Sequence, residues 1–119
     1  MASDGVTADS VRTVGGAAFD SAVLGAAGPV TVEFMSYSCA HCRANESALQ
    51  QVAQAVAPQQ QIVRVNVALE PALAAQYEVQ GTPTLLMFLH GTEIARVEGP
   101  PPDAASLLRV VTQAYGPLQ

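Results

Sequence analysis

The residue types best suited to chemistry are two cysteines, Cys39 and Cys42, which are the only cysteines of this 119-residue chain. They lie three positions apart, so a disulfide between them could not link distant segments of the chain. A disulfide between them would close a very short loop, and the loop-closure entropy would add little stability. Redox chemistry therefore explains the pair better than a structural role does.

A strand and a helix are expected to position the pair. Val30–Ser36 is rich in β-branched and apolar residues, which predicts a buried strand. After the cysteines, four apolar residues recur at helical spacing: Leu49, Val52, Ala53 and Val56. The cysteines then lie at the N-terminus and in the first turn of a helix, where unpaired N–H groups and the helix dipole stabilise negative charge. A thiolate is the only anion that this stretch offers at that point.

The thiolate is the form of cysteine that attacks a disulfide. A helix N-terminus and a neighbouring imidazolium can lower a cysteine pKa from about 8.5 to roughly 3.5–7.5. Cys39 has the helix end, and His41 lies two residues away. Stabilising the thiolate stabilises the reduced form, so the disulfide becomes more oxidising. We therefore expect Ala40 and His41, between the cysteines, to set the redox potential.

The other elements follow from hydrophobic periodicity and from Gly and Pro breakers. The expected strands are Ser10–Val14, Gln61–Ala68, Leu85–Leu89 and Glu93–Glu98. The expected helices are Ala17–Ala27, the helix after the cysteines to about Ala57, Pro71–Tyr77 and a last helix capped by Asp103. In the last strand, Ile94 and Arg96 are expected to point inward. This order predicts an α/β domain, residues 10–119, with a mixed sheet and helices on both faces; residues 1–9 are expected to form a flexible tail.

Composition narrows the possible functions. The formal net charge is −5 and the chain has no lysine, so nothing resembles the basic stripe of a nucleic-acid-binding protein. No apolar run approaches the roughly 18 residues of a membrane span. The first ten residues lack the basic and apolar regions of a secretory signal. We expect a cytoplasmic, monomeric protein with no nucleic-acid or membrane partner.

Several motifs along the chain together resemble the thioredoxin family. They are V-E-F at 32–34, C-A-H-C-R at 39–43, V-N-V at 65–67 and Y-E-V-Q-G-T-P-T-L-L-M-F-L-H-G at 77–91, followed by a glycine at position 99. The match covers roughly residues 10–116. A bare C-x-x-C would be weak evidence, but here spacing and strand context agree along nearly the whole chain.

The resemblance implies a fold, an activity and a set of roles. The fold is a central mixed five-stranded sheet flanked by four helices, and the activity is thiol–disulfide exchange with protein disulfides or dithiols. Cys39 would be the exposed nucleophile and Cys42 the resolving thiol. Glu33 stands where the family has a buried acid, and it would relay a proton to and from Cys42. Thr82-Pro83 would form a cis peptide bond that presents the Thr82 backbone to an extended substrate segment.

The chain departs from the family pattern around the cysteines. The tryptophan that usually precedes the first cysteine is Ser38 here, and Tyr37 would supply part of the lost apolar substrate surface. The usual Gly-Pro pair is Ala40-His41, and a histidine in that second place is the pattern of disulfide-donating relatives. Arg64 takes the place of the buried lysine that accompanies the acid. A thioredoxin reductase remains a candidate electron donor.

Two other readings of the same residues stay open. The chain could be a thioredoxin-fold chaperone or assembly module that grips extended segments at Thr82-Pro83 without redox turnover. Alternatively, C-A-H-C holds three metal-ligating side chains, whereas tetrahedral zinc takes four. His90 is expected about 23 Å away along its strand, so only a dimer could share a metal or an iron–sulfur cluster. We expect no metal and no cofactor beyond the cysteine pair.

Overall fold

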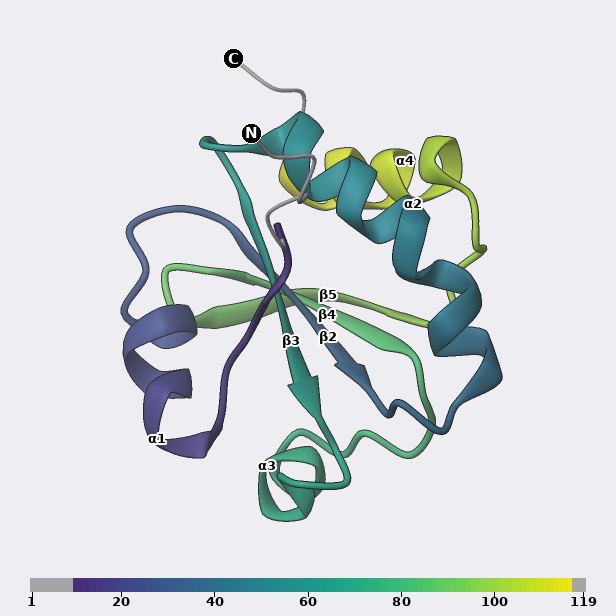
Figure 1. The fold of residues 1–119 in the computed structure, drawn as a ribbon. Coiled ribbons are helices and arrows are strands. Elements are labelled where there is room, and N and C mark those ends of the chain that lie inside the picture. The colour runs from purple at the N-terminus through teal and green to yellow at the C-terminus, as the bar shows by residue number, and fades with distance from the viewer. Residues whose placement is uncertain (1–9, 117–119) are drawn as a thin grey trace, which may run out of the picture.

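The computed structural model describes residues 10–116 and shows one mixed sheet with helices on both faces (Figure 1). The strands are β1 (Arg12–Thr13), β2 (Val30–Met35), β3 (Gln61–Asn66), β4 (Thr84–Leu89) and β5 (Thr92–Glu98). The helical segments are α1 (Gly16–Phe19), its π-helical continuation η1 (Asp20–Leu24), α2 (Ala40–Val56), α3 (Pro71–Gln76) and α4 (Ala104–Tyr115). The predicted α/β fold, with five strands and four helical regions, is confirmed. The flexible tail predicted for residues 1–9 lies outside the described residues, as do residues 117–119.

The strand order is β1-β3-β2-β4-β5. Strands β1, β3 and β2 run parallel to one another, and β4 is antiparallel to both of its neighbours, β2 and β5. The central strand β2 is buried along its whole length, as its apolar composition predicts. Its carboxyl end leads directly into the loop that carries Cys39.

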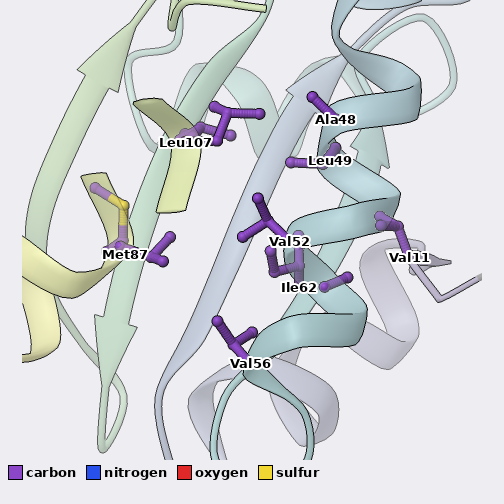
Figure 2. Packing of buried hydrophobic residues seen from close by; sticks show 11 residues of the cluster. Val11, Ala48, Leu49, Val52, Val56, Ile62, Met87 and Leu107 are labelled. Carbon is purple, nitrogen blue, oxygen red and sulfur yellow. The ribbon is translucent and has the colours of Figure 1, made fainter. Parts of the chain in front are cut away.

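Two apolar clusters cover the two faces of the sheet. The first lies beneath α2 and α4, which pack side by side, and it joins Leu49 and Leu107 to Ile62 and Met87 of the sheet (Figure 2). The second lies beneath α1, η1 and α3 on the opposite face. Alternation along β2 places Val32 and Phe34 in the second cluster, so Glu33 between them faces α2.

One expectation for β5 is wrong. Ala95 and Val97 pack against the first cluster, while the side chain of Ile94 is 43% exposed. Ala95 and Val97 lie opposite Met87 and Leu85 of the first cluster, and a register shift leaves Ile94 unpaired, because Met87 pairs with Ala95 but Phe88 pairs with Glu93. Ile94 is the extra residue of this β-bulge and turns away from the core.

The first helical region is also shorter than predicted. It ends at Leu24, where Gly25 caps η1, rather than at Gly28-Pro29. The predicted apolar side holds, since Phe19 and Val23 are buried. No helix within residues 10–116 is long and apolar enough to cross a lipid bilayer.

Candidate active site

Cys39 is the N-cap residue of α2, with an extended backbone before the first helical turn. Its sulfur accepts a hydrogen bond from the backbone N–H of Cys42, with an N···Sγ distance of 3.2 Å. This arrangement is the usual N-cap interaction with sulfur in place of oxygen. The helix end that the sequence predicts for the cysteine pair is therefore where the structure places it.

The two thiols differ in exposure and in acidity. Cys39 is half-buried, whereas Cys42 is only 3% exposed. Burial acts to raise the pKa of Cys39, but hydrogen bonds with the Cys42 and Thr82 side chains and with the backbone N–H groups of Cys42 and His41 outweigh it, so the pKa is lowered. Burial, together with the hydrogen bond to Cys39, raises the pKa of Cys42 to about 11. Cys39 is thus the thiol that ionises first.

The segment Thr82-Pro83 lies opposite the cysteines. The Thr82–Pro83 peptide bond is cis, as the resemblance implies. The Cys39 thiol donates a hydrogen bond to the Thr82 carbonyl, at an Sγ···O distance of 3.5 Å. A groove of about 290 Å³ runs beside this bond and is lined by residues 80–84, Glu98 and Gly99.

Tyr37 and Ser38 lie in the loop between β2 and α2, and both are exposed. The Tyr37 side chain is 57% exposed, the second largest exposure among the large apolar and aromatic residues that the structure describes. Arg43 donates a hydrogen bond to the Tyr37 carbonyl at 2.8 Å, and the hydroxyls of Ser36 and Ser38 are 2.9 Å apart. The loop is therefore fixed while the Tyr37 ring stays accessible.

His41 turns its imidazole towards the loop before α4. Its Nε2 lies 2.9 Å from the carbonyl oxygen of Pro100. The amide of Asn45, one turn further along α2, donates to the same oxygen at 3.2 Å. The run Gly99–Pro102, which sequence reasoning treats as a spacer, is therefore attached to the helix that carries the cysteines.

Asn45 is a residue of the site that sequence reasoning missed. Its side chain is 1% exposed, and it lies on α2 between the buried positions Cys42 and Leu49. An amide inside the apolar stripe of a helix is a signal that it binds a specific partner, because an unpaired buried amide is costly. The sequence shows this interruption but does not identify Pro100 as the partner.

Glu33 and Arg64 are neighbours on β2 and β3, and both are buried. The Glu33 carboxyl is 1% exposed, and burial raises its pKa to about 7, although the charge of Arg64 acts to lower it. Arg64 Nε lies 3.8 Å from Glu33 Oε1. A carboxyl that titrates near neutral pH, on the sheet face that α2 covers, is suited to proton transfer.

Glu46 is the second residue that sequence reasoning missed. It lies one helical turn after Cys42, and both of its carboxylate oxygens accept hydrogen bonds at 2.7 Å from Nη2 of Arg64. A pocket of about 330 Å³ brings these groups together with the resolving cysteine; its lining residues are Met35, Tyr37, Cys42, Arg43, Glu46 and Arg64. Within residues 10–116, no group of three or more His, Cys, Asp or Glu side chains is placed to hold a metal ion.

A mixed sheet of this order, with two cysteines at the start of α2 facing a cis-proline, defines a thioredoxin-fold dithiol protein. The thioredoxin family model matches residues 10–113, and the chain therefore belongs to the thioredoxin family.

The curated relatives agree with this assignment. A thioredoxin-like protein of Synechocystis sp. is 35% identical over 81 residues, which cover 68% of this chain and 77% of the relative. Thioredoxin 1 of Synechococcus elongatus is 34% identical over 86 residues, covering 72% and 80% respectively. Thioredoxin of Rhodospirillum rubrum is 33% identical over 81 residues, covering 68% and 78%. Family membership and the close cysteine pair together support a thiol–disulfide oxidoreductase role.

Proposed function

We propose that this protein exchanges disulfides with protein substrates through Cys39 and Cys42. The observation that carries the proposal is the asymmetry of the pair: an accessible thiol of lowered pKa at a helix N-terminus, backed by a buried thiol of raised pKa. Such a pair can capture a substrate sulfur with one thiol and release it with the other.

The reduction of a substrate disulfide takes two steps. The Cys39 thiolate attacks one substrate sulfur, a mixed disulfide forms, and the other substrate sulfur leaves as a thiolate that takes a proton from water. Cys42 then gives its proton to the Glu33 carboxylate and attacks Cys39 as a thiolate. The Cys39–Cys42 disulfide forms, the substrate is released with two reduced sulfurs, and the protein has lost the two electrons that the substrate gained. The reverse sequence oxidises a substrate dithiol.

The surface beside the pair is suited to an extended substrate segment. Thr82 lines the groove, and its carbonyl accepts a hydrogen bond from the Cys39 thiol. The exposed Tyr37 and Ser38 lie on the loop that precedes Cys39. Backbone hydrogen bonds to the segment and apolar contact with Tyr37 would hold a substrate of this kind. Ala40 and His41 are exposed between the cysteines and would set the redox potential.

Insulin reduction with dithiothreitol as electron donor tests the proposal. Wild-type protein should accelerate the reaction, and Cys39→Ser should abolish the acceleration. Cys42→Ser should trap substrate as a mixed disulfide, whereas Cys39→Ser should not. Because this assay supplies only protein, thiol and substrate, turnover would also support the cysteine pair as the sole redox centre.

The groove also favours a second candidate function, a chaperone that binds extended segments without redox turnover. Protection of an unfolding client from aggregation measures it. If Cys39→Ser still protects the client and the wild type is inactive in the insulin assay, the chaperone function would replace the oxidoreductase function as the proposal.

The partners and the compartment belong to the same proposal. A thioredoxin reductase would be the electron donor, and NADPH consumption in a coupled assay would show it. We place the protein in the cytoplasm, because a reducing compartment keeps such a cysteine pair available for turnover. We also propose that it acts as a monomer. Cell fractionation and light scattering test these two points, and a dimer with metal absorption would favour the shared-site alternative.

A further inference from the structure

Glu33 lies close to a cation without a direct hydrogen bond to it. Its Oε1 is fully buried and accepts no hydrogen bond, and its distance of 3.8 Å to Arg64 Nε is too long for one. An isolated buried carboxylate is unfavourable, so it would normally draw a neighbouring guanidinium into contact. Some other group must therefore compete for Arg64.

Glu46 is that competitor. Arg64 Nη2 lies 2.7 Å from each carboxylate oxygen of Glu46, which is much closer than the guanidinium lies to Glu33. Glu46 is in turn oriented from the next turn of α2, because Gln50 Nε2 donates to Glu46 Oε2 at 2.8 Å. Gln50 accepts a hydrogen bond from the backbone N–H of Ser10, also at 2.8 Å. The position of the Arg64 head group thus depends on a chain of contacts that starts at the β1 side of the sheet.

This arrangement lies beside the reacting sulfur. Glu46 and Arg64 line the same pocket as the buried thiol of Cys42. The Glu46 side chain is 40% exposed, so its contact with Arg64 is at the boundary between solvent and the buried acid. A change in that contact would reach Glu33 without altering the Cys39 surface.

We propose that Glu46 is a positioning residue: it holds the Arg64 guanidinium away from Glu33 and so keeps the Glu33 carboxyl able to take up and return a proton. The inference rests on the proposed function, in which Glu33 accepts the proton of Cys42. An Arg64 in direct contact with Glu33 would fix the carboxylate in its charged form and make it a poorer proton carrier.

The electrostatics around Glu33 agree with this role. Burial raises the pKa of Glu33 to about 7, the charge of Arg64 lowers it, and the charge of Glu46 raises it further. The charged groups that act on Glu33 are Arg64 from β3 and Glu46 from α2; its neighbour on β4 is the apolar Leu85. Removing the Glu46 charge would release Arg64 towards Glu33 and would remove the repulsion between the two carboxylates. Both effects would lower the pKa of Glu33.

The test is the substitution Glu46→Gln, which keeps the side-chain shape and removes the charge. The carboxyl carbon of Glu33 is titrated by NMR, with Glu33→Gln identifying its signal. We expect the titration midpoint of Glu33 to move down by about one pH unit, the lower end of the effect of a neighbouring arginine on a carboxyl group. A midpoint that stays in place or moves up overturns the proposal.

A matched control is available on β5. Glu93 also pairs with an arginine, at 2.9 Å from Arg96 Nε. Glu93→Gln breaks that pair far from the buried acid and should leave the Glu33 midpoint unchanged; an equal shift in this variant would overturn the proposal. Gln50→Ala removes the hydrogen bond that orients Glu46 without changing the net charge. It should therefore lower the Glu33 titration midpoint by less than Glu46→Gln does. If Glu46→Gln does not fold, Gln50→Ala provides the test.

A kinetic measurement separates this inference from the proposed function. The rate at which Cys42 releases substrate from a preformed mixed disulfide is followed against pH in wild type and Glu46→Gln. An inflection that moves down with the NMR midpoint supports both claims. A shifted NMR midpoint with an unshifted inflection supports the effect of Glu46 on Glu33 and overturns the role of Glu33 as proton acceptor.

Discussion

At the scale of single residues, the acidity of Cys39 depends on a small set of hydrogen bonds. The backbone N–H of Cys42 donates to its sulfur, and the Cys42 thiol makes a second contact. Because the thiolate is the nucleophile, the alkylation rate of Cys39 should rise with pH through a midpoint below the ordinary value of about 8.5. Iodoacetamide labelling followed by mass spectrometry measures this midpoint.

Cys42 provides the comparison for that measurement. Its pKa of about 11 and its 3% exposure should leave it unlabelled from pH 7 to 9. The substitution Cys42→Ala removes the thiol contact and keeps the backbone N–H, so it should raise the Cys39 midpoint. If Cys42 is labelled first, or if Cys42→Ala leaves the midpoint where it was, the assignment of roles is wrong.

His41 can act on Cys39 through two different groups. Its backbone N–H contributes to the lowered pKa of Cys39, while its imidazole contacts the Pro100 carbonyl. His41→Pro removes both groups at a helical position that tolerates proline, and His41→Ala removes only the imidazole. A hydrogen bond to a charged group contributes about 1.5–3 kcal/mol, and about 30 mV corresponds to 1.4 kcal/mol.

We therefore expect His41→Pro to lower the redox potential by tens of millivolts, because the thiolate form loses stabilisation. His41→Ala should lower it less if the backbone N–H carries the effect. Equilibration with glutathione buffers measures both potentials. Equal potentials in wild type and His41→Pro would remove position 41 from the determinants of redox poise.

At the scale of elements, the turn between β4 and β5 shows how the sheet and η1 are fitted together. His90 and Gly91 both have positive φ, at 51° and 81°, as expected for the tight turn of a β-hairpin. A Cβ on Gly91 would lie 2.9 Å from the backbone oxygen of Leu24 at the end of η1. Gly91 is therefore required both by the turn and by the approach of the helix.

Gly91→Ala should lower the free energy of unfolding by about 1–3 kcal/mol. Urea denaturation of the wild type and Gly91→Ala measures the loss; equal stabilities would mean that neither the turn nor the contact with Leu24 constrains this position.

The strands and long helices could be predicted because each repeats a single period over many residues. Gln61–Asn66 alternates between the two faces of the sheet, and α2 keeps one apolar stripe from Cys42 to Val56. Two features were predicted wrongly: the direction of the Ile94 side chain and the end of the first helical region, which the structure places at Leu24. A β-bulge and a π-helical turn each change the register by one residue, and the side-chain pattern carries no separate signal for them.

At the scale of the whole molecule, the candidate site divides into a local part and a long-range part. The local part is the cysteine pair at the start of α2, and its position follows from the strand and helix around it. The contact of Arg64 with Glu46 joins β3 to α2, and that of Asn45 with Pro100 joins α2 to the loop before α4. Such contacts depend on how the helices pack across the sheet, so spacing along the chain does not predict them.

The buried Glu33 links the proposed chemistry to the stability of the whole fold. Its pKa rises from 4.5, the value for an unperturbed carboxyl group, to about 7 in the folded protein. Between these two values the folded state binds more protons than the unfolded state, so the free energy of unfolding falls as pH rises. The stabilisation from the neutral carboxyl is fully present below about pH 4.5 and is lost above about pH 7. Its size is on the order of 3 kcal/mol, by about 1.4 kcal/mol per pH unit.

Glu33→Gln should remove this slope, because a buried amide does not titrate. Urea denaturation of wild type and Glu33→Gln at intervals from pH 4.5 to 8 gives the difference between the two curves, in which the contributions of other groups cancel. We expect Glu33→Gln to gain stability relative to wild type as pH rises across this window, since only the wild type must then bury a carboxylate. A constant difference would mean that the carboxyl keeps one protonation state throughout, and a group that does not change protonation near pH 7 could not carry the proton of Cys42.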